Sequence, residues 1–98
     1  MEKQEIIAKL KKEESALRMR GVLHAALFGS HARGDNDQDS DIDILVEVDL
    51  EAHLSVFDYV ELKDYIAAIY DAPVDVVSLE GLKPYIRPMV TADAAYAF

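Results

Sequence analysis

The sequence contains no cysteine and no tryptophan, and only three prolines and four glycines in 98 residues. Without cysteine, neither disulfide bonds nor thiolate-bound metal ions can hold the fold together. No apolar run approaches the roughly 20 residues that span a bilayer, and the charged segment 1–12 lacks the apolar stretch of a signal peptide. These absences predict a cytoplasmic protein that does not cross a membrane.

Positive charge is also scarce, because 10 lysines and arginines stand against 19 acidic residues, for a net charge of −9. Phosphate backbones are held by lysine and arginine, so this balance argues against a general nucleic-acid binder. A nucleotide remains compatible, since Mg²⁺ can bridge an acidic protein and an acidic ligand. A basic protein partner would also suit the charge. The length and the 51% hydrophobic content predict one domain, residues 1–98, with a thin core.

Hydrophobic periodicity and turn residues predict alternating helices and strands. The expected helices cover residues 2–20, 54–70 and the segment from 82 onward, and the expected strands cover 22–28, 41–48 and 74–79. A helical turn is expected at 31–33. In the helix 54–70, the residues expected to face inward are Phe57, Val60, Ile66 and Ile69. The order predicts an α/β (α+β) fold, in which helices pack on one small mixed β-sheet.

The strand 41–48 alternates strictly between two faces. One face carries Ile42, Ile44, Val46 and Val48, and the other carries Asp41, Asp43, Leu45 and Glu47. Asp41 and Asp43 therefore share a face, with Cα atoms about 6.5–7 Å apart. Two carboxylates at this spacing can converge on one or two divalent ions, and Mg²⁺ suits hard oxygen ligands. The alternative is a strand edge that merely faces solvent, which Leu45 on the same face argues against.

A third carboxylate, Asp75, interrupts the apolar strand 74–79. A charge in such a run is rarely buried without a partner. If this strand lies beside the strand 41–48, Asp75 can complete a cluster of three carboxylates. It would then help to hold the metal and take the proton of an attacking hydroxyl. The alternative is an ion pair between Asp75 and an arginine or lysine.

Gly29 and Ser30 come where the first expected strand ends. Glycine lets the backbone approach a phosphate closely, and Ser30 adds a hydroxyl and a backbone N–H. Arg33 follows three residues later and could reach the same phosphates with its guanidinium group. The alternatives are an ordinary turn for Gly29 and Ser30, and a surface salt bridge for Arg33.

The acidic segment 35–43 does not have the pattern of a calcium-binding EF-hand loop. A loop that starts at Asp35 would need glycine at its sixth position and glutamate at its twelfth. Those positions hold Ser40 and Val46. Asp35, Asp37 and Asp39 are therefore expected in a solvated loop, and the three histidines are not spaced as a metal-binding set.

The pattern of Gly29-Ser30, ten residues, and then Asp41-x-Asp43 resembles the signature of the minimal nucleotidyltransferases within the DNA polymerase β superfamily. The neighbouring text Gly-Ser-His-Ala-Arg-Gly and Ser-Asp-Ile-Asp-Ile-Leu-Val is also similar to that family, and so is the position of Asp75. The resemblance covers about residues 22–79. It implies a polymerase β-like nucleotidyltransferase fold in which Gly29 and Ser30 grip the triphosphate of a nucleotide.

The resemblance further implies that Asp41 and Asp43 are metal ligands and that Asp75 is the third carboxylate. Family members of this length are commonly encoded beside a HEPN-domain protein and act as the antitoxin of a toxin–antitoxin pair. The implied activity is transfer of AMP from ATP to a tyrosine of the HEPN toxin. This implies Mg²⁺ as cofactor, ATP as substrate and the toxin as partner.

Two other functions stay open at this point. The chain could neutralise a toxin by stoichiometric contact without turnover, or it could nucleotidylate a small molecule such as an aminoglycoside, or an RNA. One departure from the family lies near the C-terminus. Where members often read Leu-Arg-Glu-Ala, residues 90–94 read Val-Thr-Ala-Asp-Ala and lack the arginine. This departure concerns the contacts of the last helix and not the metal site.

Overall fold

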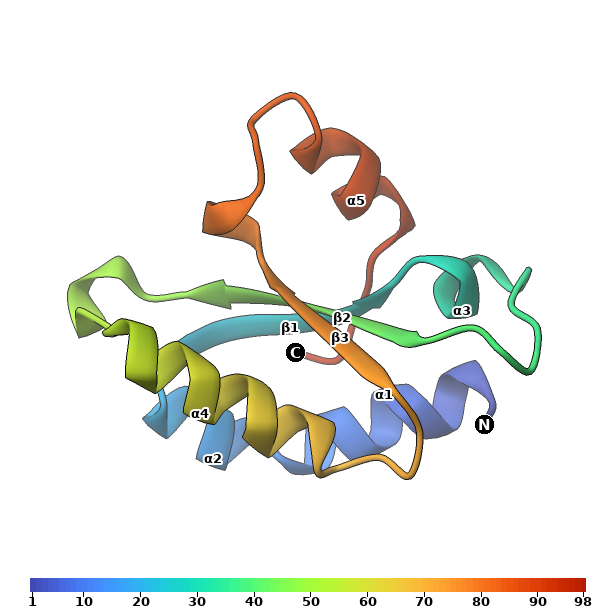
Figure 1. Ribbon diagram of the computed structural model, residues 1–98, viewed down its shortest axis with the longest axis horizontal. Coiled ribbons are helices and arrows are strands. Elements are labelled where there is room, and N and C mark those ends of the chain that lie inside the picture. Colours follow the sequence, from blue (N-terminus) through green and yellow to red (C-terminus); the bar gives the residue numbers. More distant parts are fainter.

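The computed structural model describes all residues from 1 to 98 and contains one mixed sheet of four strands. The strands are β1 (Val22–Phe28), β2 (Ile42–Val48), β3 (Val74–Ser78) and β4 (Ala95–Tyr96), and their order across the sheet is β3-β2-β1-β4 (Figure 1). β2 pairs antiparallel with β1 and parallel with β3, while β4 adds an antiparallel edge to β1. The α/β prediction with a small mixed sheet is therefore confirmed.

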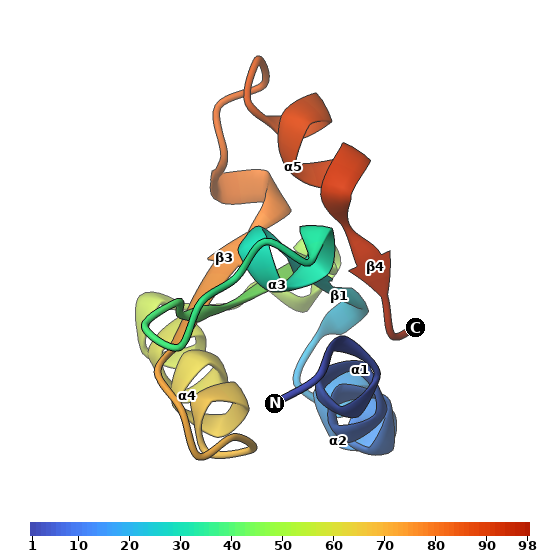
Figure 2. The ribbon, with the colours of Figure 1, turned by 90° about the vertical axis from the view of Figure 1, so that its right-hand side faces the viewer.

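Three helices cover one face of this sheet (Figure 2). They are α1 (Lys3–Lys12), α2 (Glu14–Met19) and α4 (Val56–Ala67). The short helix α3 (Ser30–Arg33) follows β1 directly, and α5 (Arg87–Asp93) stands on the opposite face. Two 3₁₀ turns, η1 (Leu50–Ala52) and η2 (Leu79–Gly81), follow β2 and β3. No helix is long and apolar enough to cross a membrane.

The hydrophobic core lies between the sheet and these three helices. The four aliphatic residues that β2 turns toward the helices are all buried, as the alternation predicts: Ile42, Ile44, Val46 and Val48. α1 contributes Ile6 and Leu10, which are fully buried. The core therefore uses one face of β2, and the other face carries Asp43 and Glu47 on either side of the buried Leu45.

The N-terminal helix and the helix after β2 differ from their predictions. The expected helix 2–20 is interrupted at Glu13, which separates α1 from α2. The expected helix 54–70 is shorter, because a capping box between Ser55 and Asp58 starts α4 at Val56. Of the four residues expected to face inward, Ile66 is buried as predicted and Ile69, which follows the end of α4, is partly buried, but Phe57 and Val60 are exposed.

The prediction that Phe57 and Val60 face inward is wrong, because α4 packs through a different stripe. Its buried residues are Leu62 and Ile66, and Tyr59 packs at the edge of the core. Phe57 and Val60 lie on the other side of the helix from this stripe. Their solvent exposure, 80% and 51%, leaves an apolar surface that the core does not use.

The C-terminal segment also differs from its prediction. Only Arg87–Asp93 forms a helix, because residues 82–86 lead into it as an irregular arm that contains Pro84. The strand β4 was not predicted. Two residues carry too little alternation to be recognised, and β4 exists through its pairing with Ala26 and Leu27 of β1.

Candidate active site

The parallel pairing of β2 and β3 brings two of the candidate carboxylates side by side. Asp43 and Asp75 are register partners, and Phe28 is the partner of Asp43 on the other neighbouring strand. Register partners on adjacent strands lie roughly 4.8 Å apart and point to the same face of the sheet. Asp43 and Asp75 therefore both project from the face that the three helices leave open.

Gly29 lies directly against the carboxylate of Asp43. A Cβ atom added to Gly29 would stand 2.3 Å from Oδ2 of Asp43 and 3.1 Å from its Cγ. The φ angle of Gly29 is +74° with ψ −152°, a conformation that only glycine adopts without strain. The glycine is required here for both reasons, and it holds the turn after β1 against the acidic end of β2.

Asp41 is the third acidic residue of this group. It lies just before β2, since the strand begins at Ile42 and not at residue 41 as predicted. The pKa of Asp43 is raised, first by burial, then by the negative charge of Asp75 and then by that of Asp41. Asp41 and Asp75 are exposed, whereas Asp43 is half-buried. Asp41 and Asp75 thus both lie within electrostatic reach of Asp43.

The chemistry of this group fits a divalent cation. As placed, no three acidic or histidine side chains stand close enough together to form a ready metal site. However, the pKa of Asp43 is raised by burial first and then by the negative charges of Asp75 and Asp41, and a cation between these carboxylates would relieve their repulsion. All three groups offer hard oxygens, and two of them are exposed side chains that can rotate.

His31 belongs to the site although the sequence did not single it out. Its side chain is 8% exposed, and it is the one polar residue of the chain that is buried. Its Nδ1 lies 3.1 Å from the carbonyl oxygen of Asp41, and because a carbonyl only accepts, Nδ1–H is the donor. His31 therefore joins the turn after Ser30 to the backbone that carries Asp41. The only feature of the sequence that could have indicated this role is the position of His31 between the two halves of the motif, Gly29-Ser30 and Asp41-x-Asp43.

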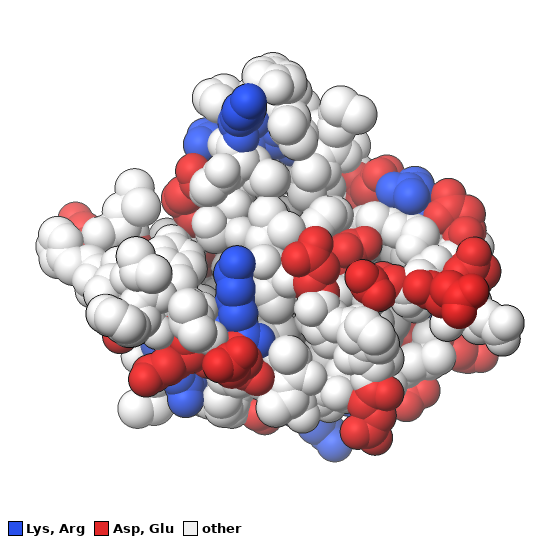
Figure 3. Space-filling view, in the orientation of Figure 1, with Lys and Arg blue, Asp and Glu red and all other residues white.

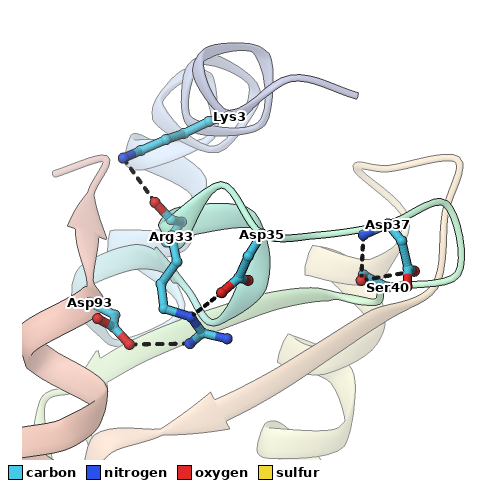
Figure 4. A network of polar contacts seen from close by, with 7 residues as sticks. Lys3, Arg33, Asp35, Asp37, Ser40 and Asp93 are labelled. Atoms are coloured by element: carbon cyan, nitrogen blue, oxygen red, sulfur yellow. Dashed lines mark hydrogen bonds and ion pairs between the residues drawn. The ribbon is translucent and has the colours of Figure 1, made fainter.

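Ser30 and Arg33 both lie on α3, next to Gly29. The hydroxyl of Ser30 makes no hydrogen bond within the chain. Arg33 donates from Nε to Asp35 at 3.0 Å and from Nη1 to Asp93 of α5 at 3.2 Å (Figure 4). Both carboxylates raise the pKa of Arg33, with Asp35 the larger influence. The surface salt bridge left open by the sequence is present, and the phosphate contact stays a prediction.

The acidic end of the sheet is an open surface. Acidic side chains gather on the side of the molecule that carries α3 and the loop after it (Figure 3). None of the cavities is lined by Asp41, Asp43 or Asp75. One cavity of about 310 Å³ is lined by His31, Ser40 and Ile42, whose positions in the chain flank Asp41 or lie near it, but not by Asp41 itself. A substrate would therefore lie on this surface without being enclosed by this chain.

The family of nucleotidyltransferase domains matches residues 4–96. The chain belongs to this family. It is 37% identical over 94 residues to the protein adenylyltransferase MntA of Thermococcus cleftensis, and the alignment covers 95% of this chain and 93% of that one. The resemblance to minimal nucleotidyltransferases and the prediction of a nucleotidyltransferase enzyme are thereby confirmed.

Solved structures agree with the assignment of the fold. A chain provisionally described as a minimal nucleotidyltransferase superposes with a TM-score of 0.80 at 30% identity, over 97% of this chain and 95% of that chain. A chain from a toxin–antitoxin crystal structure with AMP-PNP superposes with a TM-score of 0.70 at 27% identity, over 92% of this chain and 72% of that chain. The nucleotidyltransferase fold predicted from the motif is therefore confirmed.

Proposed function

We propose that this chain transfers AMP from ATP to a tyrosine hydroxyl of a partner HEPN toxin and thereby acts as an antitoxin. One observation carries the proposal: Gly29 contacts the carboxylate of Asp43, which is paired in register with Asp75. The turn and the carboxylates that the motif names are thus next to one another. The relative named as the protein adenylyltransferase MntA supports adenylyl transfer to a protein, and the toxin–antitoxin structure with AMP-PNP supports an ATP-like substrate and a toxin partner.

Gly29, Ser30 and Arg33 would bind the triphosphate. Gly29 lets the backbone approach a phosphate, and the free hydroxyl of Ser30 can donate to it. Arg33 is held beside the site by Asp35 and Asp93, and exchange of one carboxylate for a phosphate would keep its charge paired. The positive charge of Arg33 lowers the pKa of Asp43 against the larger opposing influences of burial, Asp75 and Asp41, so the guanidinium lies within electrostatic reach of Asp43.

Asp41, Asp43 and Asp75 would hold one or two Mg²⁺ ions. When bound, Mg²⁺ neutralises charge on the triphosphate and on the leaving pyrophosphate. Asp43 contributes most to this role, because it is the half-buried member and Gly29 and Phe28 fix its surroundings. The exposed Asp41 is anchored through its backbone carbonyl by His31, so that its side chain remains free to turn toward a cation.

Asp75 would take the proton of the acceptor. In the transfer, the hydroxyl oxygen of the acceptor bonds to the α-phosphorus of ATP and the bond to pyrophosphate breaks. The hydroxyl proton passes to a carboxylate, and Asp75 is the exposed one on the sheet face that carries Asp43. The protein otherwise supplies position and charge, which is most of what phosphoryl transfer requires.

The open shape of the site favours a macromolecular acceptor. No cavity of this chain contains the three carboxylates, so a small acceptor would find few walls around it. A protein acceptor brings its own surface and can exclude water from the reaction. The net charge of −9 suits a basic RNA-binding toxin.

A labelling experiment tests the proposal. The purified chain is incubated with Mg²⁺ and α-labelled ATP, with and without the HEPN-domain protein encoded beside it. Label should appear on a tyrosine of that protein, require Mg²⁺, and disappear with Asp43→Ala. Asp39→Ala is the matched control, because Asp39 is an exposed aspartate of the neighbouring loop and should transfer label normally.

Each outcome of this experiment has a definite meaning. A HEPN protein that is inhibited without becoming labelled would overturn the enzymatic proposal in favour of stoichiometric binding. Label on RNA or on an aminoglycoside, and none on the protein, would overturn the proposed acceptor. Label transfer by Asp43→Ala at the rate of the unchanged chain would overturn the assignment of the site.

A further inference from the structure

The outer face of η1 and α4 carries an apolar surface that the fold does not use. It consists of Leu50, Val56, Phe57 and Val60, which are 72%, 77%, 80% and 51% exposed; we call it the α4 patch. Figure 3 shows the region over η1 and the start of α4 as largely uncharged. The core contact of α4 is made by Leu62 and Ile66 on its other side, so the patch has no partner within the chain.

The α4 patch is a preformed surface on an ordered helix. Ser55 Oγ accepts from the backbone N–H of Asp58 at 3.1 Å, and the Asp58 carboxylate accepts from the N–H of Ser55 at 2.9 Å. This capping box fixes the first turn of α4, where Val56 and Phe57 lie. Because the helix is already ordered, binding of a partner here would lose little conformational entropy. Clustered large apolar side chains on a surface also mark interaction sites.

Charges around the patch indicate what kind of molecule covers it. Glu51 follows Leu50, and Glu61 and Asp64 lie beside or beyond Val60 along α4; all three are exposed. Lys63 is the one basic residue on this helix, and Arg20, just after α2, lines a hollow together with Glu61 and Asp64. Acidic residues still outnumber these basic ones, because Asp58 of α4 is exposed as well. A second copy of this chain would bring the same acidic rim and a net charge of −9, so self-association is disfavoured. A basic surface with an apolar centre is complementary.

The patch lies at the far end of the sheet from the acidic site. Asp43 is near the start of β2, and Leu50 follows two residues after its end at Val48, so β2 separates them by about 20 Å. Figure 1 shows η1 and the start of α4 on one side of the molecule and α3 on the other. A protein held by the patch therefore leaves the carboxylates free to reach one of its residues, or a residue of a second bound copy.

We propose that the α4 patch is the docking surface for the basic toxin protein, separate from the site that modifies it. This inference rests on the proposed function, because it specifies where the toxin partner of that function binds. Phe57 is the anchor, since exposed aromatic residues carry a large share of binding energy in protein interfaces. Contacts remote from the reacting residue also raise the local concentration of the acceptor at the site.

Binding measurements with Phe57→Glu and Val60→Glu test the docking surface. The probe is the purified HEPN-domain protein encoded beside this chain, and its affinity is measured by calorimetry. Each variant should weaken binding about tenfold or more without lowering the melting temperature. Met89→Glu is the matched control, because Met89 is 72% exposed on α5 and outside the patch, and it should bind as the unchanged chain does.

The charge reversal Glu61→Lys gives a second measurement. It should slow association with the probe several-fold at low salt, and this difference should shrink as salt is added. Unchanged affinity in Phe57→Glu and Val60→Glu would overturn the proposal. A dimer of this chain alone in sedimentation, broken by Phe57→Glu, would overturn it in favour of self-association.

The two proposals fail in different ways. If label is transferred and the patch variants bind the probe with unchanged affinity, the proposed docking surface is contradicted and the proposed transferase activity is not. If Phe57→Glu weakens binding but no label is transferred to the probe, the proposed transferase activity is contradicted and the proposed docking surface is not. Asp39→Ala should keep the affinity of the unchanged chain for the probe, because Asp39 is exposed and lies outside both the patch and the three carboxylates.

Discussion

The two faces of β2 have opposite roles in this protein. The residues that face α1, α2 and α4 are all aliphatic and at most 4% exposed: Ile42, Ile44, Val46 and Val48. The opposite face carries Asp43 and Glu47 on either side of the buried Leu45. A single strand thus supports the core on one side and presents charge on the other, and its period of two separates the roles.

The difference shows where stability is gained and where it is given up. Aliphatic burial on the helix-covered face favours folding. On the open face, burial and two neighbouring carboxylates raise the pKa of Asp43, so the ionised form of this residue opposes folding. Functional sites commonly hold such unfavourable charge, which a bound cation or substrate then relieves.

The largest expected effect comes from breaking the covered face. Ile44 is 0% exposed, and Ile44→Ala should lower the free energy of unfolding by about 2–5 kcal/mol. The folded fraction should still transfer label, because the carboxylates lie on the other face. Urea unfolding followed by circular dichroism measures the change. Leu23→Ala, at a residue 43% exposed, is the control, and a loss below about 1 kcal/mol for Ile44→Ala would contradict the prediction.

The next effect comes from crowding the open face with Gly29→Ala. The added Cβ would stand 2.3 Å from Oδ2 of Asp43, so the carboxylate must move. A displacement of about 1 Å can reduce transfer roughly a hundredfold. Gly34→Ala is a matched control, because Gly34 also has a positive φ, +84°, but nothing lies within 4 Å of its added Cβ. Equal transfer rates for the two variants would show that backbone strain alone is responsible.

A smaller effect is expected when the link between the turn and Asp41 is removed. His31→Leu deletes the donor to the Asp41 carbonyl and should reduce kcat about tenfold, because Asp41 loses its position. His31→Asn retains an N–H donor and should recover most of the rate. Both variants are compared by kcat, KM and melting temperature. A loss of melting temperature with unchanged kcat would make His31 purely structural.

The smallest effect concerns stability and pH. Since the pKa of Asp43 is raised in the folded state, the unfolded state binds fewer protons there and stability falls as pH rises through that pKa. Asp43→Asn removes this penalty and should raise the melting temperature by a few degrees at pH 7. The gain should vanish below about pH 4, where the carboxyl is protonated in both states.

Calorimetric scans over this pH range measure the gain, with Asp39→Asn as the exposed control. Added Mg²⁺ should raise the melting temperature of the unchanged chain and not that of Asp43→Asn, if the cation binds among these carboxylates. An Asp43→Asn variant that is less stable at pH 7 would contradict the account of the open face.

Prediction from sequence succeeded where local spacing controls the outcome. The order of the main elements, the faces of β2 and the turn at Gly29 all follow from neighbouring residues. Prediction failed where packing between segments that are distant in the sequence decides which residues are buried or paired. The apolar residues Phe57 and Val60 were expected in the core, but α4 offers two apolar sides and the sheet covers only one. A two-residue strand such as β4 is likewise visible only through its partner β1.

The sequence by itself determined the chemistry of this protein: which carboxylates share a face, which glycine ends the first strand, and how little positive charge the surface holds. Tertiary structure alone decided that Asp75 lies beside Asp43, that His31 anchors Asp41, and that the outer side of α4 stays exposed. Local patterns report periodicity along one segment. Contacts between segments depend on register and packing, which no single segment encodes.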